Sequence, residues 1–275
     1  MLIDIAGIKL NLNIHNPSDN LPVLIMLHGF TGSGEDWNET ISFLGEELTY
    51  ATVDLIGHGK SNSPLDVENY KAESITGQIY EIVKRFKGRK IALLGYSMGG
   101  RAALMFATVH PEMVDALIFE STTAGIDDDK TRLERKISDE ALAEFIENHT
   151  MSEFVDRWMN QEMFKSQRKL DISKLNKLRQ SRLNNNPIGL ANTLKGFGTG
   201  VMPALYDRLY RISCPVLLVT GQLDEKFSEI NRKISQVFPN AEHVIIGNAG
   251  HNVHLEQPQE FSRIVKGFLI RRLLK

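Results

Sequence analysis

Short apolar runs alternate with helical stretches along most of this chain. Residues 22–27 (Pro-Val-Leu-Ile-Met-Leu) are almost continuously apolar, as expected of a strand buried on both faces of a sheet. Residues 74–86 instead place Ile75, Ile79 and Val83 at helical spacing. The alternation predicts an α/β fold with a mostly parallel sheet and helices on both faces. We expect further strands at 50–53, 90–94, 116–119, 216–220 and 243–246, an opening hairpin at 3–5 and 9–14, and a closing helix at 258–269.

The alternation is interrupted between about residues 127 and 210. This stretch contains no convincing strand, and we interpret it as a helical cap inserted between two strands of the sheet. The chain would then consist of an α/β core of residues 1–126 and 211–275 and a helical cap of residues 127–210. Within the cap we expect helices at 138–149, 151–159, 171–182 and 187–197, and the acidic run Asp127-Asp-Asp129 is typical of a solvated helix start.

One turn between a predicted strand and a predicted helix carries the most informative motif, Gly95-Tyr-Ser-Met-Gly-Gly-Arg101. In this context G-x-S-x-G is typical of a nucleophile elbow, in which the serine stands exposed on a sharp turn. Glycine at Gly95 and Gly99 permits a turn too tight for side chains. The motif alone has low specificity, because glycine-rich turns are common. Other residues of the chain must therefore show whether Ser97 is catalytic.

Two later strands end in the residues that an activated serine needs. Asp224 follows the run 216–220, and His251 follows the run 243–246, in the order Ser, Asp, His expected of an α/β-hydrolase fold. The sequence therefore predicts a triad of Ser97, Asp224 and His251. His254 is a rival base, but it lies nearer the closing helix and is expected at the surface or behind the reacting residues.

A reaction at Ser97 also requires two backbone N–H donors for a developing negative charge. One donor should be Met98, directly after the serine. The other should be Phe30, in the glycine-bearing loop that follows the strand 22–27. His28 is expected to brace this loop at the edge of the substrate site.

Over its full length the chain resembles the α/β-hydrolase superfamily, and within it the 2-succinyl-6-hydroxy-2,4-cyclohexadiene-1-carboxylate synthases of menaquinone biosynthesis. The narrower resemblance rests on Arg101 closing the elbow, on Asp224-Glu-Lys-Phe227 and on Arg182-Leu-Asn-Asn-Asn-Pro187. It implies elimination of pyruvate from 2-succinyl-5-enolpyruvyl-6-hydroxy-3-cyclohexene-1-carboxylate, without hydrolysis and without a cofactor. Ser97 would then act as a general base.

The resemblance also implies how such a tricarboxylate is held. Carried over position by position, the carboxylate-binding arginines of this family fall on Arg101, Arg135 and Arg182, and a pocket aromatic falls on Trp158. The sequence independently favours an anionic substrate, because residues 165–182 contain seven basic residues and one acidic residue. Arginine suits carboxylates through its planar fork of donors. Tyr96, beside the nucleophile, and Lys226 and Phe227, after Asp224, are further candidates to line the pocket.

Composition excludes several other classes of function. The formal net charge is −2, which provides no overall field for nucleic acid or an anionic membrane. The single cysteine, Cys214, cannot form an internal disulfide. We find no secretory segment, no membrane span and no histidine spacing typical of a metal site. We therefore expect a cytoplasmic enzyme without metal or cofactor, whose partner is a small molecule. Its oligomeric state is expected to be a monomer or a small homo-oligomer.

Two alternatives stay open at this point. A carboxylesterase or C–C-bond hydrolase would use the same triad with Ser97 as a covalent nucleophile. A non-catalytic small-molecule receptor on the same fold would bind its ligand without turnover. Such a receptor would not need the three triad residues, all of which are present in this chain.

Overall fold

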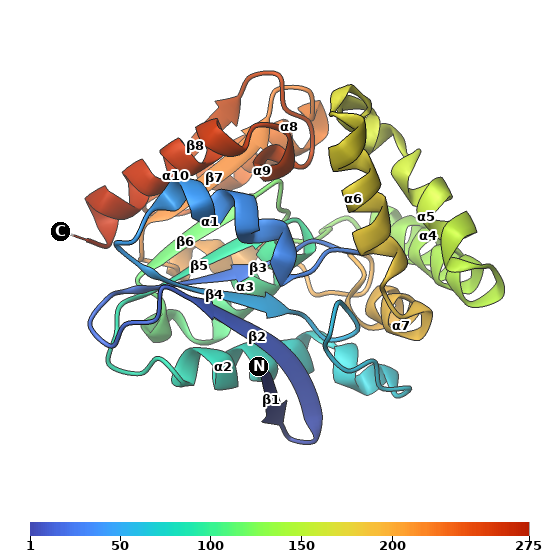
Figure 1. The fold of residues 1–275 in the computed structure, drawn as a ribbon, viewed down its shortest axis with the longest axis horizontal. Helices are drawn as coiled ribbons and strands as arrows, with labels where there is room; N and C mark the ends of the chain where they lie inside the picture. The colour runs from blue at the N-terminus through green and yellow to red at the C-terminus, as the bar shows by residue number, and fades with distance from the viewer. Residues whose placement is uncertain (275) are drawn as a thin grey trace.

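An eight-stranded, mostly parallel sheet forms the centre of the computed structural model, which describes residues 1–274 (Figure 1). The strand order is β1-β2-β4-β3-β5-β6-β7-β8. The first two strands run antiparallel to their neighbours, and the remaining pairs are parallel. This arrangement confirms the predicted fold class. The strands are β1 (Leu2–Ile5), β2 (Ile8–His15), β3 (Val23–Leu27), β4 (Thr49–Asp54), β5 (Ile91–Tyr96), β6 (Ala116–Glu120), β7 (Val216–Gly221) and β8 (Ala241–Ile246).

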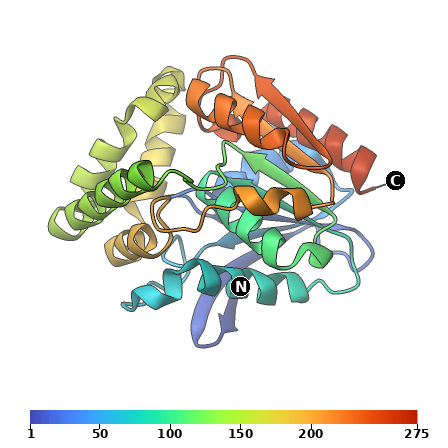
Figure 2. The ribbon, with the colours of Figure 1, turned by 180° about the vertical axis from the view of Figure 1, so that it is seen from behind.

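Helices cover both faces of the sheet, as the continuously apolar strands require. Every residue of β3, β5, β6 and β7 is buried. One apolar cluster packs α2, α3 and α8 against one face, and a second packs α1 and α10 against the other (Figures 1 and 2). The helices of these layers are α1 (Asn38–Leu44), α2 (Ala72–Lys84), α3 (Met98–Val109), α8 (Glu225–Ser235), α9 (Val253–Glu256) and α10 (Pro258–Arg272).

Four further helices lie between β6 and β7 in the sequence and stand to one side of the sheet (Figure 1). They are α4 (Asp129–Asn148), α5 (Met151–Met159), α6 (Ile172–Leu183) and α7 (Pro187–Phe197). Phe154, Ile146 and Leu190 belong to a separate apolar cluster within this group. We refer to residues 127–210 as the cap, a division of the chain that we retain as a proposal.

The cap differs from the sequence prediction at its start and in its short 3₁₀-helices. Helix α4 begins at Asp129, within the acidic run expected to start a helix and nine residues before the helix predicted at 138–149, with Asp128 as its N-cap. Residues 129–137 are mostly charged or polar, and their two large apolar residues, Leu133 and Ile137, are both 57% exposed, so they form only a weak apolar stripe. The 3₁₀-helices at Glu162–Lys169 and Tyr206–Arg211 were not predicted, because such short helices have little periodicity.

No helix within residues 1–274 combines the length and the apolar character needed to cross a membrane.

The first turn of α3 approaches the end of β3 very closely, and glycine makes this approach possible. A Cβ atom on Gly99 would collide with the backbone oxygens of Leu27 and His28, and one on Gly95 would collide with the backbone of Gly100. The elbow glycines are therefore required by packing between strands and helix, as well as by the turn itself.

We expect Gly99→Ala to lower the free energy of unfolding by roughly 1–3 kcal/mol, because rigid backbone would have to move to accept the methyl group. Gly77→Ala is the matched control: Gly77 is an exposed residue of α2 with no atom within 4 Å of the added Cβ. That change should raise the free energy of unfolding by roughly 0.5–1 kcal/mol. Urea denaturation measures both, and equal effects of the two substitutions would contradict the packing argument.

Candidate active site

Ser97 occupies the sharp turn between β5 and α3, with φ +50° and ψ −103°. A residue other than glycine rarely adopts positive φ, and such a conformation persists only where its surroundings hold it. Here the Ser97 N–H donates to the Glu120 carbonyl at 2.8 Å, at the end of the neighbouring strand β6. The sheet thus holds the strained turn, and the serine side chain is left free to react.

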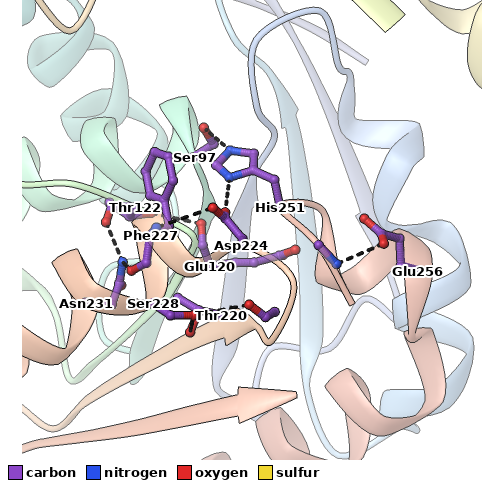
Figure 3. A network of polar contacts seen from close by, with 12 residues as sticks. Ser97, Glu120, Thr122, Thr220, Asp224, Phe227, Ser228, Asn231, His251 and Glu256 are labelled. Carbon is purple, nitrogen blue, oxygen red and sulfur yellow. Dashed lines mark hydrogen bonds and ion pairs between the residues drawn. The ribbon is translucent and has the colours of Figure 1, made fainter. Parts of the chain in front are cut away.

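A hydrogen-bonded chain connects Ser97 to two loops at the same edge of the sheet (Figure 3). His251 Nε2 lies 3.1 Å from Ser97 Oγ, and His251 Nδ1 lies 2.6 Å from Asp224 Oδ2. The carboxylate selects the imidazole tautomer whose Nε2 can accept the serine proton. The structure therefore brings the three predicted triad residues together in a geometry suited to proton removal from the serine.

Two further contacts hold the histidine in place. The Glu256 carboxylate accepts a hydrogen bond of 2.9 Å from the N–H of Gly250, the residue before His251 (Figure 3). Burial raises the pKa of Glu256. The Phe227 ring packs edge-on against His251, with 4.5 Å between ring centroids. These contacts limit rotation of the imidazole away from the serine.

His254, the rival base, lies in a different place. It is fully buried, and its Nδ1 is 2.7 Å from the carboxylate of Glu120, which also accepts the His254 N–H at 3.0 Å. Trp37 stacks on its ring at 4.2 Å. This second histidine–carboxylate pair joins the end of β6 to the first turn of α9, so it braces these two elements.

Above the triad is a cavity of about 790 Å³ between the core and the cap. Its wall includes the nucleophile, the predicted donors Phe30 and Met98, and residues of α4, α5 and α7. Within residues 1–274, the Phe30 and Met98 amides donate to no other protein group. They are therefore available to a substrate oxygen, as an oxyanion hole requires.

Two arginines line the cavity in different settings. Arg101 is 8% exposed, stacks on the Phe197 ring at 4.9 Å, and donates to the Phe197 carbonyl at 2.7 Å. Burial, together with the positive charge of Arg135, lowers the pKa of Arg101 to about 9. Arg135 lies nearer solvent and forms an ion pair of 2.8 Å with Asp139. A buried guanidinium without a directly paired carboxylate favours an anionic ligand.

Aromatic side chains form much of the remaining wall. Trp158 packs edge-on against Phe30 at 5.2 Å, and its indole Nε1 is buried without a hydrogen-bond partner in residues 1–274. Burial raises the pKa of Tyr96 well above its usual value, so its hydroxyl stays protonated and can donate. Phe227 and Lys226 line the same cavity.

Two of the predicted site residues do not reach this cavity. Arg182 lies at a second, smaller cavity of about 20 Å³, and its guanidinium stacks on Phe164 at 5.0 Å. His28 is fully buried: its Nε2 accepts the Leu55 N–H at 2.9 Å and its Nδ1 lies 2.7 Å from the Gly29 carbonyl. The structure thus places His28 as a brace of the loop. Arg182 lines only the smaller cavity, which shares Phe30, Tyr96 and Phe164 with the larger one.

Sequence reasoning missed residues that the fold brings to the site. Ser121 lines the cavity with φ +47°, and its buried hydroxyl has no partner within residues 1–274. Glu120 holds both the Ser97 turn and His254. The available signal was the cluster Glu120-Ser-Thr-Thr123 directly after an apolar strand, where polar residues often mark a site.

In residues 1–274, no group of three or more histidine, cysteine, aspartate or glutamate side chains is arranged to hold a metal ion. The expectation that no metal is required stays a prediction.

Comparison with known proteins agrees with this geometry. Residues 22–258 match the model of the alpha/beta hydrolase fold family, and the chain therefore belongs to that family. It is 42% identical to the putative 2-succinyl-6-hydroxy-2,4-cyclohexadiene-1-carboxylate synthase of Bacillus subtilis, over 90% of this chain and 89% of that protein.

Two solved structures extend the comparison. MenH from S. aureus superposes with a TM-score of 0.91 at 34% identity, covering 96% of this chain and 98% of that one. A malate-bound thermophilic esterase from Thermogutta terrifontis superposes with a TM-score of 0.84 at 25% identity, covering 98% and 96% of the two chains.

We expect Ser97→Ala to reduce turnover by roughly 10⁴ to 10⁶-fold, a loss typical of removing a triad serine. The small, half-buried Ser97 side chain lines the cavity and contributes little packing, so the thermal unfolding midpoint should stay close to that of the wild type. Steady-state kinetics and calorimetry measure the two quantities. Retention of more than about a tenth of the wild-type rate would remove Ser97 from the reaction.

Proposed function

We propose that this protein is a carbon–oxygen lyase of menaquinone biosynthesis, a 2-succinyl-6-hydroxy-2,4-cyclohexadiene-1-carboxylate synthase. It would eliminate pyruvate from 2-succinyl-5-enolpyruvyl-6-hydroxy-3-cyclohexene-1-carboxylate. The observation that carries this proposal is a hydrolase-type triad at one wall of a cavity that also contains Arg101, Arg135 and Lys226. The 42% identity to the Bacillus subtilis protein supports the same reaction.

In this mechanism Ser97 acts as a base. His251 draws the serine proton, and Asp224 keeps the imidazole in the required tautomer. The serine oxygen removes a proton from a ring carbon of the substrate. The electron pair of that C–H bond moves through the ring and breaks the C–O bond. Enolpyruvate leaves, takes up the proton held by His251 and tautomerises to pyruvate. The Phe30 and Met98 amides stabilise the charge that develops on a substrate oxygen.

Recognition of the substrate would depend on its three carboxylates. Arg101 and Arg135 supply two cations inside the cavity, and Lys226 supplies a third at its wall. Trp158 and Phe227 offer apolar contact to the ring. We do not include Arg182 or His28 among the contacting residues, because neither lines this cavity.

A carboxylesterase is the second candidate, and the triad geometry favours it as much as it favours the lyase. Ser97 would then attack an ester carbonyl and form an acyl-enzyme. The similarity to the Thermogutta terrifontis esterase supports this alternative, although its 25% identity is lower than the 42% found for the synthase.

The decisive test is to incubate the purified protein with the enolpyruvyl substrate and to follow pyruvate with a coupled lactate dehydrogenase assay. Rapid pyruvate release with slow turnover of p-nitrophenyl acetate supports the lyase. Rapid ester turnover with no pyruvate release would establish the esterase instead.

We expect Arg101→Ala to lower kcat/KM for the tricarboxylate by about 30- to 5,000-fold, since loss of a partner from a desolvated charge pair costs roughly 2–5 kcal/mol. Arg135→Ala should lower it by a smaller factor, because the Arg135 side chain is 42% exposed and already pairs with Asp139. Hydrolysis of a small neutral ester, where measurable, should survive both changes. Arg179→Ala is the control, because Arg179 pairs with Asp156 at 2.9 Å outside the cavity. Equal losses on both substrates would show that the arginines maintain the fold instead.

Activity should also survive removal of divalent metal ions, because the proposed mechanism uses only side chains and backbone amides. The measurement is pyruvate release after exhaustive dialysis against a chelator. Loss of activity that returns on adding a divalent cation would contradict the proposed mechanism.

A further inference from the structure

The loop that carries the Phe30 amide contains a strained turn. The Gly32 N–H donates to the Gly29 carbonyl at 3.0 Å, so residues 29–32 form a closed turn. Thr31, the third residue of this turn, has φ +68°. Positive φ at that position favours glycine, and a β-branched residue adopts it at a cost. The turn therefore needs support from other parts of the structure.

Asn185 of the cap provides this support. Its Nδ2 donates to the Thr31 carbonyl at 2.9 Å, and its Oδ1 accepts the Gly59 N–H at 3.2 Å. The side chain is only 6% exposed, so these hydrogen bonds are shielded from water. Their loss would leave buried polar groups unpaired and would lower the free energy of unfolding. One cap side chain thus connects two core loops that follow β3 and β4.

We propose that Asn185 is a positioning residue that fixes the oxyanion-hole amide of Phe30, a role that rests on the proposed reaction at Ser97. Phe30 lies between the two anchored carbonyls of this turn, Gly29 O and Thr31 O. When Thr31 O is held, the turn cannot relax toward the negative φ that threonine prefers. The Phe30 N–H then keeps its direction toward the reacting oxygen.

This contact makes the oxyanion hole depend on how the cap is seated. The Phe30 ring also packs against cap residues, at 5.2 Å from Trp158 and 6.5 Å from Phe154. Both the side chain of Phe30 and the turn that holds its amide are therefore in contact with the cap. A cap that loses Asn185 should still cover the cavity but should orient the donor poorly.

Asn192 offers a matched control within the same cap. It is 5% exposed, and its Nδ2 donates to the carbonyls of Pro64 at 3.1 Å and Leu65 at 3.0 Å. It therefore joins cap to core with the same kind of bond as Asn185. It does not contact the Phe30 loop, so its removal should weaken the cap–core junction without changing the oxyanion hole.

The first experiment compares kcat and KM for pyruvate release in Asn185→Ala and Asn192→Ala. We expect Asn185→Ala to lower kcat by about 10- to 100-fold with a smaller change in KM, because misplaced catalytic groups lose rate. Asn192→Ala should retain the wild-type kcat, although both variants lower the thermal midpoint. Equal kcat losses in the two variants, or an unchanged kcat in Asn185→Ala, would overturn the proposal.

A second readout does not depend on the natural substrate. A p-nitrophenyl phosphonate forms an Oγ–P bond with Ser97 and expels nitrophenolate, while the serine proton passes to His251. The phosphonyl oxygen occupies the oxyanion hole, so Asn185→Ala should slow this reaction and Asn192→Ala should not. If phosphonate labelling is slower in Asn185→Ala but the wild type releases no pyruvate, the lyase activity is rejected and the role of Asn185 is retained. Normal labelling of Asn185→Ala would reject that role, whichever substrate the enzyme uses.

A double substitution tests whether Asn185 acts by holding the strained turn at Thr31. Glycine adopts φ near +68° without steric cost, so Asn185→Ala should reduce kcat by a smaller factor in a Thr31→Gly background. The same factor in both backgrounds would show that Asn185 does not act on this turn. Asn185→Asp keeps the acceptor for Gly59 but removes the donor to Thr31. It should reproduce the loss of kcat, and it serves as the test if the alanine variant does not fold.

Discussion

The arrangement of the site depends on one close contact, between the first turn of α3 and the ends of β3 and β6. The strained backbone of Ser97 exists because its N–H is held by the Glu120 carbonyl. Gly99 lets the same turn press against Leu27, at the start of the Phe30 loop. Backbone packing alone therefore brings Ser97 close to the loop that carries the Phe30 amide, the proposed oxyanion donor.

Buried and half-buried carboxylates then organise the histidines around this contact. Asp224 orients His251, Glu256 holds the backbone just before it, and Glu120, the fully buried one, binds His254. Each carboxylate has a defined hydrogen-bond partner, which offsets the cost of burying it. His251 and His254 therefore differ by environment: one faces the serine and the cavity, while the other is enclosed by Trp37 and Glu120.

The cap completes the site from the opposite side. It contributes Arg135 and Trp158 to the cavity wall, and Asn185 contacts the loop that carries Phe30. In our proposal the core supplies the reacting groups, whereas the cap supplies charge for recognition and holds one oxyanion donor. The same core could therefore serve a lyase or an esterase, and the residues of the cap would decide between them.

The sequence by itself determined the sheet, most helices and the three triad residues, because these follow from local patterns: buried apolar strands, and polar residues directly after them. It could not determine the contents of the cavity. Arg101, Arg135 and Arg182 look alike in sequence, but only the first two line the larger cavity, whereas Arg182 stacks on Phe164 and lines the smaller one. The contact from Asn185 to Thr31 joins residues 154 positions apart. Such contacts depend on how the cap packs on the core, and no local pattern encodes that packing.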